Sequence, residues 1–165
     1  MAKIYAKSLK AELFELSAVS AGKDDIRKIV KQGDLNNKIL FLDEIHRFNK
    51  AQQDFLLPYV ESGELTLIGA TTENPSFEII SALLSRCKVY VLNKLSSQEI
   101  ETLLRNAITD KERGLGNFDI EIDDSTISFI SSFCDGDSRI AYNILEIASG
   151  GAGLRSDTEG RTLKI

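Results

Sequence analysis

The stretch ILFLDEIHRF, residues 39–48, decides the fold class of this protein. Four apolar residues run directly into two acids, Asp43 and Glu44. A continuous apolar run of this length is typical of a strand that is covered on both faces in a parallel sheet. In open parallel sheets, ligands bind beyond the carboxyl ends of the strands. The stretch therefore predicts an inner strand over 38–42 with two carboxylates at the edge where a ligand would bind.

Strand-like and helix-like segments alternate on both sides of this stretch, and the alternation predicts an α/β protein with a parallel sheet flanked by helices. Pro58 is expected to kink or end the helix in which it lies. The expected order is helix 2–11, strand 13–19, helix 23–33, strand 38–42, helix 50–63, strand 64–72, a loop and short helix in 74–87, and strand 88–92.

The pattern changes after residue 93, where three helical segments follow and strands disappear. The first of them opens with a capping box, because Glu99 lies three residues after Ser96. We expect three regions: a partial α/β core (1–93), a small all-helical domain (94–150) and a flexible, Gly-rich tail (151–165).

The composition excludes several classes of protein. Among 165 residues, 42% are hydrophobic and 27% are charged, which is ordinary for a globular protein. No apolar run approaches the ~20 residues of a membrane span, and we expect no signal peptide and no membrane partner. Two distant cysteines fit no zinc motif. Because the net charge is −5, any DNA contact must use a local patch or residues outside this chain.

A second polar cluster, Thr71 to Asn74, follows the next predicted strand. If the two strands are neighbours, this cluster and the acids share one edge of the sheet. Asp43 could then supply a hard oxygen ligand to a divalent cation, and Glu44 could orient an attacking water. A side chain such as Thr72 or Asn74 could sense a γ-phosphate. The alternative is that Asp43 caps the following segment and Glu44 is solvated.

Several motifs resemble those of AAA+ ATPases. The stretch ILFLDEIH resembles a Walker B motif, LIGATTENPS a sensor 1 strand, ALLSRC the Ser-Arg-Cys segment of clamp-loader-like members, and GDSRIAYNILEIA a sensor 2 helix. The block from Leu42 to Cys87 is most similar to the replication-associated recombination protein A family, whose eukaryotic members are the Werner-helicase-interacting ATPases.

The resemblance implies a role for each matching residue. Asp43 would bind Mg²⁺ and Glu44 would activate water. Thr72 would be sensor 1, with Thr71 and Asn74 as the alternatives. The two arginines of the set are Arg86, which would act in trans on a neighbouring subunit, and Arg139, which would be the sensor 2 residue of the helical lid.

Other interpretations stay open for three residues. Arg86 could be an ordinary surface arginine, and Arg139 could pair with Asp137 or Glu146. His46 is interpreted as a structural hydrogen-bonding residue rather than a catalytic one.

The phosphate-binding motif GxxxxGK[ST] is absent from the sequence. The pair Gly22-Lys23 does not replace it, because no glycine lies five residues before Gly22 and an aspartate follows Lys23. We expect the chain to be an AAA+ fragment truncated after Walker A, which alone binds ATP weakly and does not hydrolyse it.

For the full-length protein, the resemblance implies an ATPase that uses ATP and Mg²⁺ and acts on DNA at stalled replication forks. It also implies a homo-oligomer, replication proteins as partners, and a cytoplasmic, nucleoid-associated or, in eukaryotes, nuclear location. The alternatives are a clamp-loader subunit, a Holliday-junction branch-migration motor, or a non-catalytic interaction module.

Overall fold

The computed structural model describes residues 1–32, 38–150 and 162–164. The chain divides into two compact units, Met1–Tyr90 and Val91–Ile165, and each is described by itself. This division falls just before the boundary of 93 and 94 expected from the sequence. Gly33, the last residue of the helix expected over 23–33, and most of the expected tail lie outside the described residues.

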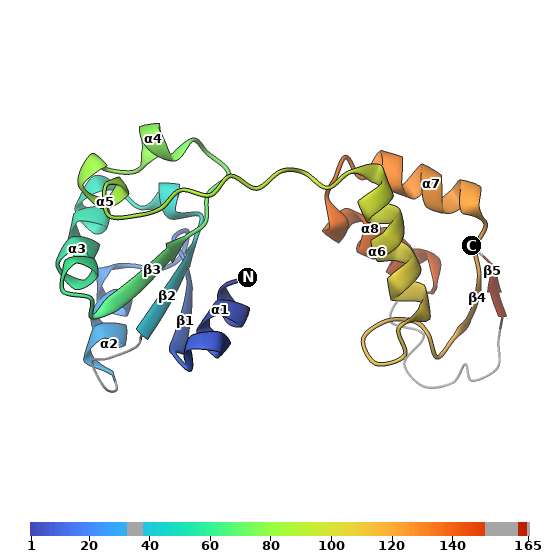
Figure 1. The fold of residues 1–165 in the computed structure, drawn as a ribbon, viewed down its shortest axis with the longest axis horizontal. Coiled ribbons are helices and arrows are strands. Elements are labelled where there is room, and N and C mark those ends of the chain that lie inside the picture. The colour runs from blue at the N-terminus through green and yellow to red at the C-terminus, as the bar shows by residue number, and fades with distance from the viewer. Residues whose placement is uncertain (33–37, 151–161, 165) are drawn as a thin grey trace. The chain divides into compact units, whose positions relative to one another are not determined.

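A parallel three-stranded sheet forms the centre of the first unit, in the order β1-β2-β3 (Figure 1). Its strands are β1 Glu12–Ser17, β2 Lys38–Asp43 and β3 Leu65–Gly69. The middle strand β2 carries the apolar run, and its Ile39, Leu40 and Leu42 are buried. The parallel α/β sheet predicted from the sequence is therefore confirmed.

Helices flank this sheet, with α2 and α3 on one side of it and α1 on the other (Figure 1). The described helical elements of the unit are α1 Ala2–Leu9, α2 Lys23–Lys31, the 3-10 turn η1 Ile45–Arg47, α3 Lys50–Glu61, α4 Pro75–Glu78 and α5 Ser81–Leu84. Helix α3 begins after its Asn49 cap and continues through Pro58 to Glu61. The helix therefore ends three residues after the proline, not at it. Buried side chains of α2, β2, α3, β3 and α5 form one apolar core.

A buried glutamine fastens the α4–α5 segment to α3. Gln53 is 1% exposed. Its Nε2 donates to the carbonyl oxygens of Phe48 (2.9 Å) and Glu78 (3.0 Å), and its Oε1 accepts from the Ile80 N–H (2.9 Å). Every polar group of this side chain is thus used, as burial of an amide requires. The contacts fix the segment that leads from the end of β3 to Arg86.

The strand expected over 88–92 is wrong. Residues 88–96 form no helix or strand, and the apolar side chains Val89, Tyr90, Val91 and Leu92 are all at least half exposed. β-Branched and aromatic composition favours a strand only where a neighbouring strand completes the hydrogen bonds. The described sheet offers this segment no such partner.

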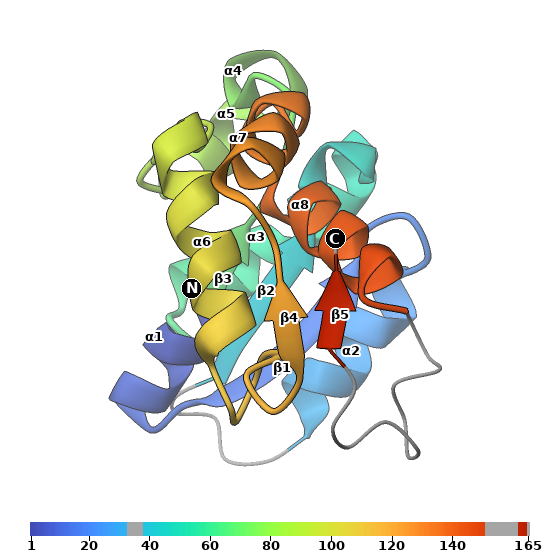
Figure 2. The same ribbon diagram turned by 90° about the vertical axis from the view of Figure 1, so that its right-hand side faces the viewer.

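The second unit packs three helices around a separate core. They are α6 Ser97–Thr109, α7 Asp124–Phe133 and α8 Ser138–Ala148. The predicted capping box at the start of α6 is present, with Ser96 and Glu99 as its members. The unit is not purely helical, since β4 Asp119–Glu121 pairs in parallel with β5 Thr162–Lys164 (Figure 2). A strand of three residues is too short to show a distinctive sequence pattern, so the sequence did not predict it.

Across the described parts of the chain, no helix combines the length and the apolarity that a membrane crossing requires. Both cysteines are free: Cys87 is exposed, whereas Cys134 is buried in the core of the second unit.

Candidate active site

The carboxyl ends of β2 and β3 lie side by side. The strands are hydrogen-bonded neighbours, with Leu42 opposite Gly69. Beyond them the pairing continues, because the Ala70 N–H donates to the Leu42 carbonyl oxygen and the Ile45 N–H donates to the Ala70 carbonyl oxygen, both at 3.0 Å. The strands are neighbours, the condition that the sequence left open, so the acids at the end of β2 and the hydroxyls that follow β3 meet at one edge of the sheet. We call this edge, from Asp43 to His46 and from Ala70 to Asn74, the rim.

Asp43 presents its carboxylate to solvent as the last residue of β2. Its Oδ1 accepts the backbone N–H of Glu44 at 3.1 Å, which holds the group in one orientation. Within the described residues it forms no ion pair, so carboxylate oxygen remains available. An oxygen donor at the end of a central strand fits a Mg²⁺ ion that keeps most of its water and phosphate ligands.

Glu44 adopts the left-handed backbone conformation, with φ 54° and ψ 43°. Residues other than glycine adopt this region rarely, at a cost of roughly 1 kcal/mol or more, and mostly where the surroundings enforce it. Its Oε2 lies 3.2 Å from Nδ1 of His46, and about a third of its side chain is exposed. Glu44 therefore combines a fixed carboxylate with access to water, which a group that orients an attacking water needs.

Of the two adjacent threonines, Thr71 rather than Thr72 contacts the His46 side chain that lies beside Glu44. Thr71 Oγ1 is 2.9 Å from Nδ1 of His46 and accepts the N–H of Glu73 at 3.0 Å. Thr72 is exposed. Asn74 caps α4, with its side-chain oxygen accepting the N–H of Ser76 at 3.0 Å. The sensor roles of Thr72 and Asn74 stay predictions.

Arg86 lies after α5, away from these contacts along the chain. Its Nη2 is 2.5 Å from Oε1 of Glu61, and its Nη1 donates to the carbonyl oxygen of Ala82 and to Oγ of Ser85. The side chain of Arg86 is 40% exposed. A partly exposed arginine that is paired at one edge is accessible to a partner, although its role in trans stays a prediction.

Arg139 belongs to the second unit, where it lies in the first turn of α8. Its guanidinium pairs with Asp137 at 3.3 Å, which is the alternative that the sequence left open. This hydrogen bond, together with the Arg139 N–H, lowers the pKa of Asp137. The side chain of Arg139 is 88% exposed, and its sensor 2 role stays a prediction.

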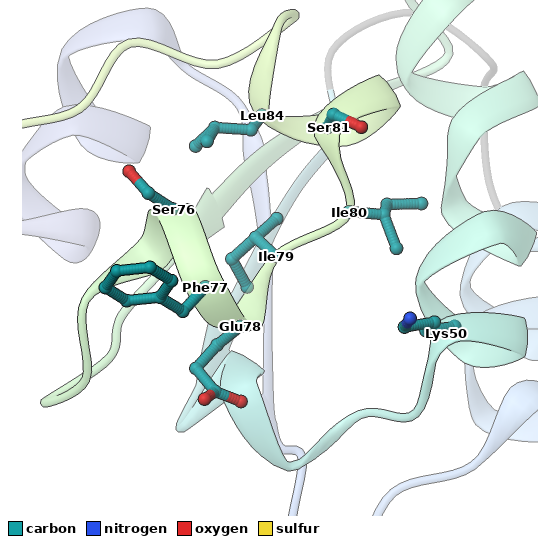
Figure 3. A pocket seen from close by; sticks show the side chains of 8 residues that line it. All are labelled: Lys50, Ser76, Phe77, Glu78, Ile79, Ile80, Ser81 and Leu84. Carbon is teal, nitrogen blue, oxygen red and sulfur yellow. The ribbon is translucent and has the colours of Figure 1, made fainter.

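A shallow pocket of about 300 Å³ lies between Lys50 of α3 and the α4–α5 segment (Figure 3). It is lined by Lys50, residues 76–81 and Leu84. None of the predicted site residues lines it, so the candidate site is the rim and not this pocket.

A family model described as "ATPase family associated with various cellular activities (AAA)" matches residues 1–95. The chain belongs to the AAA family of ATPases. The match covers β1, β2, β3 and the whole rim, so the acids at the end of β2 and the polar cluster after β3 lie in the matched part. Membership of this family implies nucleotide binding, usually with Mg²⁺.

This AAA chain is similar to curated proteins named for replication-associated recombination. It is 45% identical over 99% of its length to "Replication-associated recombination protein A" of Escherichia coli (strain K12). It is 48% identical over 89% of its length to the protein of that name from Coxiella burnetii. It is 41% identical over 99% of its length to "ATPase WRNIP1" of Dictyostelium discoideum. The resemblance to the recombination protein A family is therefore confirmed. The chain spans only 38%, 34% and 19% of these three relatives.

Among solved structures, the AAA chain is similar to the RuvB Holliday junction branch migration motor of Thermotoga maritima. The TM-score is 0.71 at 28% identity, over 88% of this chain and 48% of that one. This similarity supports the α/β fold assignment independently of the family model.

Proposed function

We propose that this chain forms part of the ATP site of an AAA subunit that acts on DNA in replication-associated recombination, at stalled forks. The observation that carries the proposal is the rim, where the acids that end β2 lie beside the hydroxyls that follow β3. The names of the relatives that match nearly all of the chain supply the biological setting.

In this proposal the residues of the rim have separate roles in ATP hydrolysis. ATP, when bound, supplies the phosphoanhydride bond that is broken, and Mg²⁺ offsets the charge of its phosphates. Asp43 provides an oxygen ligand for the ion, and Glu44 orients the attacking water. Thr72, or in its place Thr71 or Asn74, reports on the γ-phosphate by a hydrogen bond. The phosphate-binding loop is supplied by the rest of the subunit, because no GxxxxGK[ST] motif occurs in these residues.

Two arginines connect this site to other parts of the assembly. Arginine stays charged and offers a planar fork of donors to phosphate oxygens. Arg86 of one subunit would reach the nucleotide of the next, which makes hydrolysis depend on a homo-oligomer. Arg139 would bring nucleotide state to the helical lid of 94–150, as a ligand-biased domain closure.

The surroundings of the subunit follow from the same proposal. The partners are DNA, further copies of the subunit and replication proteins, in the bacterial cytoplasm with the nucleoid or in a eukaryotic nucleus. Because the chain carries a net charge of −5, binding to DNA phosphates must come from a local basic patch or from the rest of the subunit.

The first test is ATP turnover by the full-length subunit. Glu44→Gln keeps the shape of the side chain but removes the carboxylate, so we expect kcat to fall by about 10²–10⁴-fold, the usual contribution of an acid–base group. Nucleotide binding, measured separately by fluorescence titration, should persist in this variant. Unchanged turnover in Glu44→Gln would overturn the proposal, and so would appreciable turnover by the 165-residue chain without a phosphate loop.

The second test asks whether Arg86 acts between subunits. Glu44→Gln subunits and Arg86→Ala subunits should each be inactive alone. When they are mixed, some sites combine an intact Glu44 with an intact Arg86 from the neighbour, so part of the turnover should return. A mixture as inactive as its two components would count against the role in trans. Arg86→Lys is the matched control, because it keeps the charge but loses the planar fork.

The similarity to RuvB favours one alternative, a motor that migrates branched DNA junctions. The two proposals differ in substrate. A replication-associated factor should be stimulated most by gapped or forked DNA, whereas a branch-migration motor should require a four-way junction. Turnover measured with matched fork and junction substrates at one salt concentration decides between them.

A further inference from the structure

His46 contacts both segments of the rim. Its side chain is only 10% exposed, and it is the sole histidine of the 165 residues. Its Nδ1 faces two groups at once, Thr71 Oγ1 at 2.9 Å and Glu44 Oε2 at 3.2 Å. One ring nitrogen thus bridges the acid that follows β2 and the hydroxyl that follows β3.

The chemistry of these two neighbours decides where the imidazole proton lies. An ionised carboxylate only accepts hydrogen bonds, whereas a hydroxyl can accept or donate. The short approach of Nδ1 to Glu44 is therefore favourable only when Nδ1 carries the proton. Thr71 then accepts at its oxygen, from Nδ1–H and from the Glu73 N–H, and its own proton remains free for a further acceptor such as a phosphate oxygen.

The backbone around His46 is held in place by close packing. The side chain of Ile45 is buried and lies so near Gly69 that a Cβ at Gly69 would come within 3.0 Å of Ile45 Cδ1. The Ile45 N–H donates to the Ala70 carbonyl oxygen at 3.0 Å. These contacts fix the turn in which Glu44 takes its left-handed conformation, so the backbone positions of Glu44 and His46 are held relative to each other.

We propose that His46 is a positioning residue, whose Nδ1–H holds the Glu44 carboxylate in place and couples it to the Thr71 hydroxyl at the end of β3. This inference rests on the proposed role of Glu44 in orienting water and deepens it. A group that binds Thr71 shifts the hydrogen bond between Thr71 and His46, and Nδ1 of His46 also contacts Glu44. His46 therefore links Thr71, through a hydrogen bond, to Glu44, through a close charge contact.

The first test needs no nucleotide. Because the chain has a single histidine, its ring nitrogens give unambiguous signals in a long-range ¹H–¹⁵N correlation spectrum. At pH 8, where a free imidazole is neutral, we expect the 165-residue chain to carry the proton on Nδ1. Removal of the acceptor in Glu44→Ala should shift the ring toward the Nε2–H form. An Nε2–H ring in the unaltered chain would overturn the proposal.

The second test uses turnover by the full-length subunit. An asparagine amide can place its nitrogen near the position of Nδ1, whereas a glutamine amide extends toward that of Nε2. We expect His46→Ala and His46→Gln to lower kcat by about 10- to 100-fold with KM unchanged, because misplacement of a catalytic group by about 1 Å has an effect of this size. His46→Asn should restore most of the turnover. Equal loss in all three variants, or a rise in KM alone, would overturn the positioning role.

These outcomes separate the two proposals. If the full-length subunit shows no turnover that depends on Glu44, the proposed function fails. The tautomer of His46 then still decides whether His46 Nδ1–H contacts Glu44. If turnover depends on Glu44 but is unaffected by His46→Ala, only the positioning role fails.

Discussion

At the scale of single residues, the least expected feature is the burial of a charged side chain at the start of β2. Lys38 is 3% exposed, and its Nζ donates to the carbonyl oxygens of Ile29 (3.2 Å) and Val30 (2.8 Å) at the end of α2. Carbonyl oxygens in the last turn of a helix lack intrahelical partners and attract cations. Lys38, at the start of β2, therefore caps the C-terminal end of α2.

We expect Lys38→Met to lower the free energy of unfolding by about 1–3 kcal/mol, because the Ile29 and Val30 carbonyl oxygens lose the Lys38 donor while the apolar stem is kept. The Ile29 oxygen keeps the N–H of Gln32 at 3.3 Å. Chemical denaturation at pH 7 measures this change. Lys31→Met is the matched control, since Lys31 is exposed at the end of the same helix, and it should change stability by no more than about 0.5 kcal/mol. Equal effects of both substitutions would contradict the capping role.

Two residues of the rim, Thr71 and His46, received only minor roles in the sequence analysis. The sequence showed two adjacent threonines and a histidine close to the acids, but strand register and the turn after β2 decide which of them meet. The turn at Glu44 brings His46 back to its carboxylate. A dipeptide such as Thr71-Thr72 carries no signal for which hydroxyl faces the neighbouring strand.

At the scale of elements, acidic side chains accept backbone N–H groups at the N-termini of two helices. The Asp25 carboxylate accepts the Gly22 N–H before α2, and the Glu99 carboxylate accepts the Ser96 N–H before α6. These backbone hydrogen bonds are the main reason that the pKa of each acid lies below its ordinary value of 3.8 or 4.5. The capping box of α6 was readable from sequence because its spacing is local.

A pH dependence follows from these lowered pKa values. Since the folded pKa lies below the unfolded one, the stabilisation is complete above the unfolded value and disappears as pH falls through the folded pKa. We therefore expect stability to decrease from about pH 5 downward. Urea unfolding across this range measures the slope.

The charge of the caps is tested by amide variants, which keep the shape of the side chain. Asp25→Asn and Glu99→Gln should each make the acid-side loss of stability shallower than in the unaltered chain. Asp54→Asn is the control, because Asp54 lies on the exposed part of α3 and accepts no hydrogen bond from a helix N-terminus. An unchanged slope in both cap variants would contradict the assignment.

At the scale of the whole molecule, the described residues form two cores that share no residue. Leu40 is fully buried in the first and Leu104 is 1% exposed in the second. The two cores belong to units that divide after Tyr90. We therefore predict that each unit responds to damage in its own core, which also tests the domain division expected from the sequence.

We expect Leu40→Ala and Leu104→Ala each to cost about 2–5 kcal/mol in the unit that carries the substitution. Amide hydrogen exchange, followed residue by residue, measures where protection is lost. Leu40→Ala should reduce protection in the first unit and leave α6 to α8 as in the unaltered chain. The reverse should hold for Leu104→Ala. Parallel loss of protection in both units would show a single cooperative domain instead.

The sequence by itself determined the alternation of strands and helices, the parallel sheet, the family and the two acids at the end of an inner strand. These depend on hydrophobic runs and local spacings, which any short window of sequence contains. Tertiary structure alone decided that β2 and β3 are neighbours, that His46 meets Thr71, that Lys38 caps α2, and that 88–92 forms no strand. Each of these depends on a partner in another element, and local sequence does not specify which other segment will supply the contact.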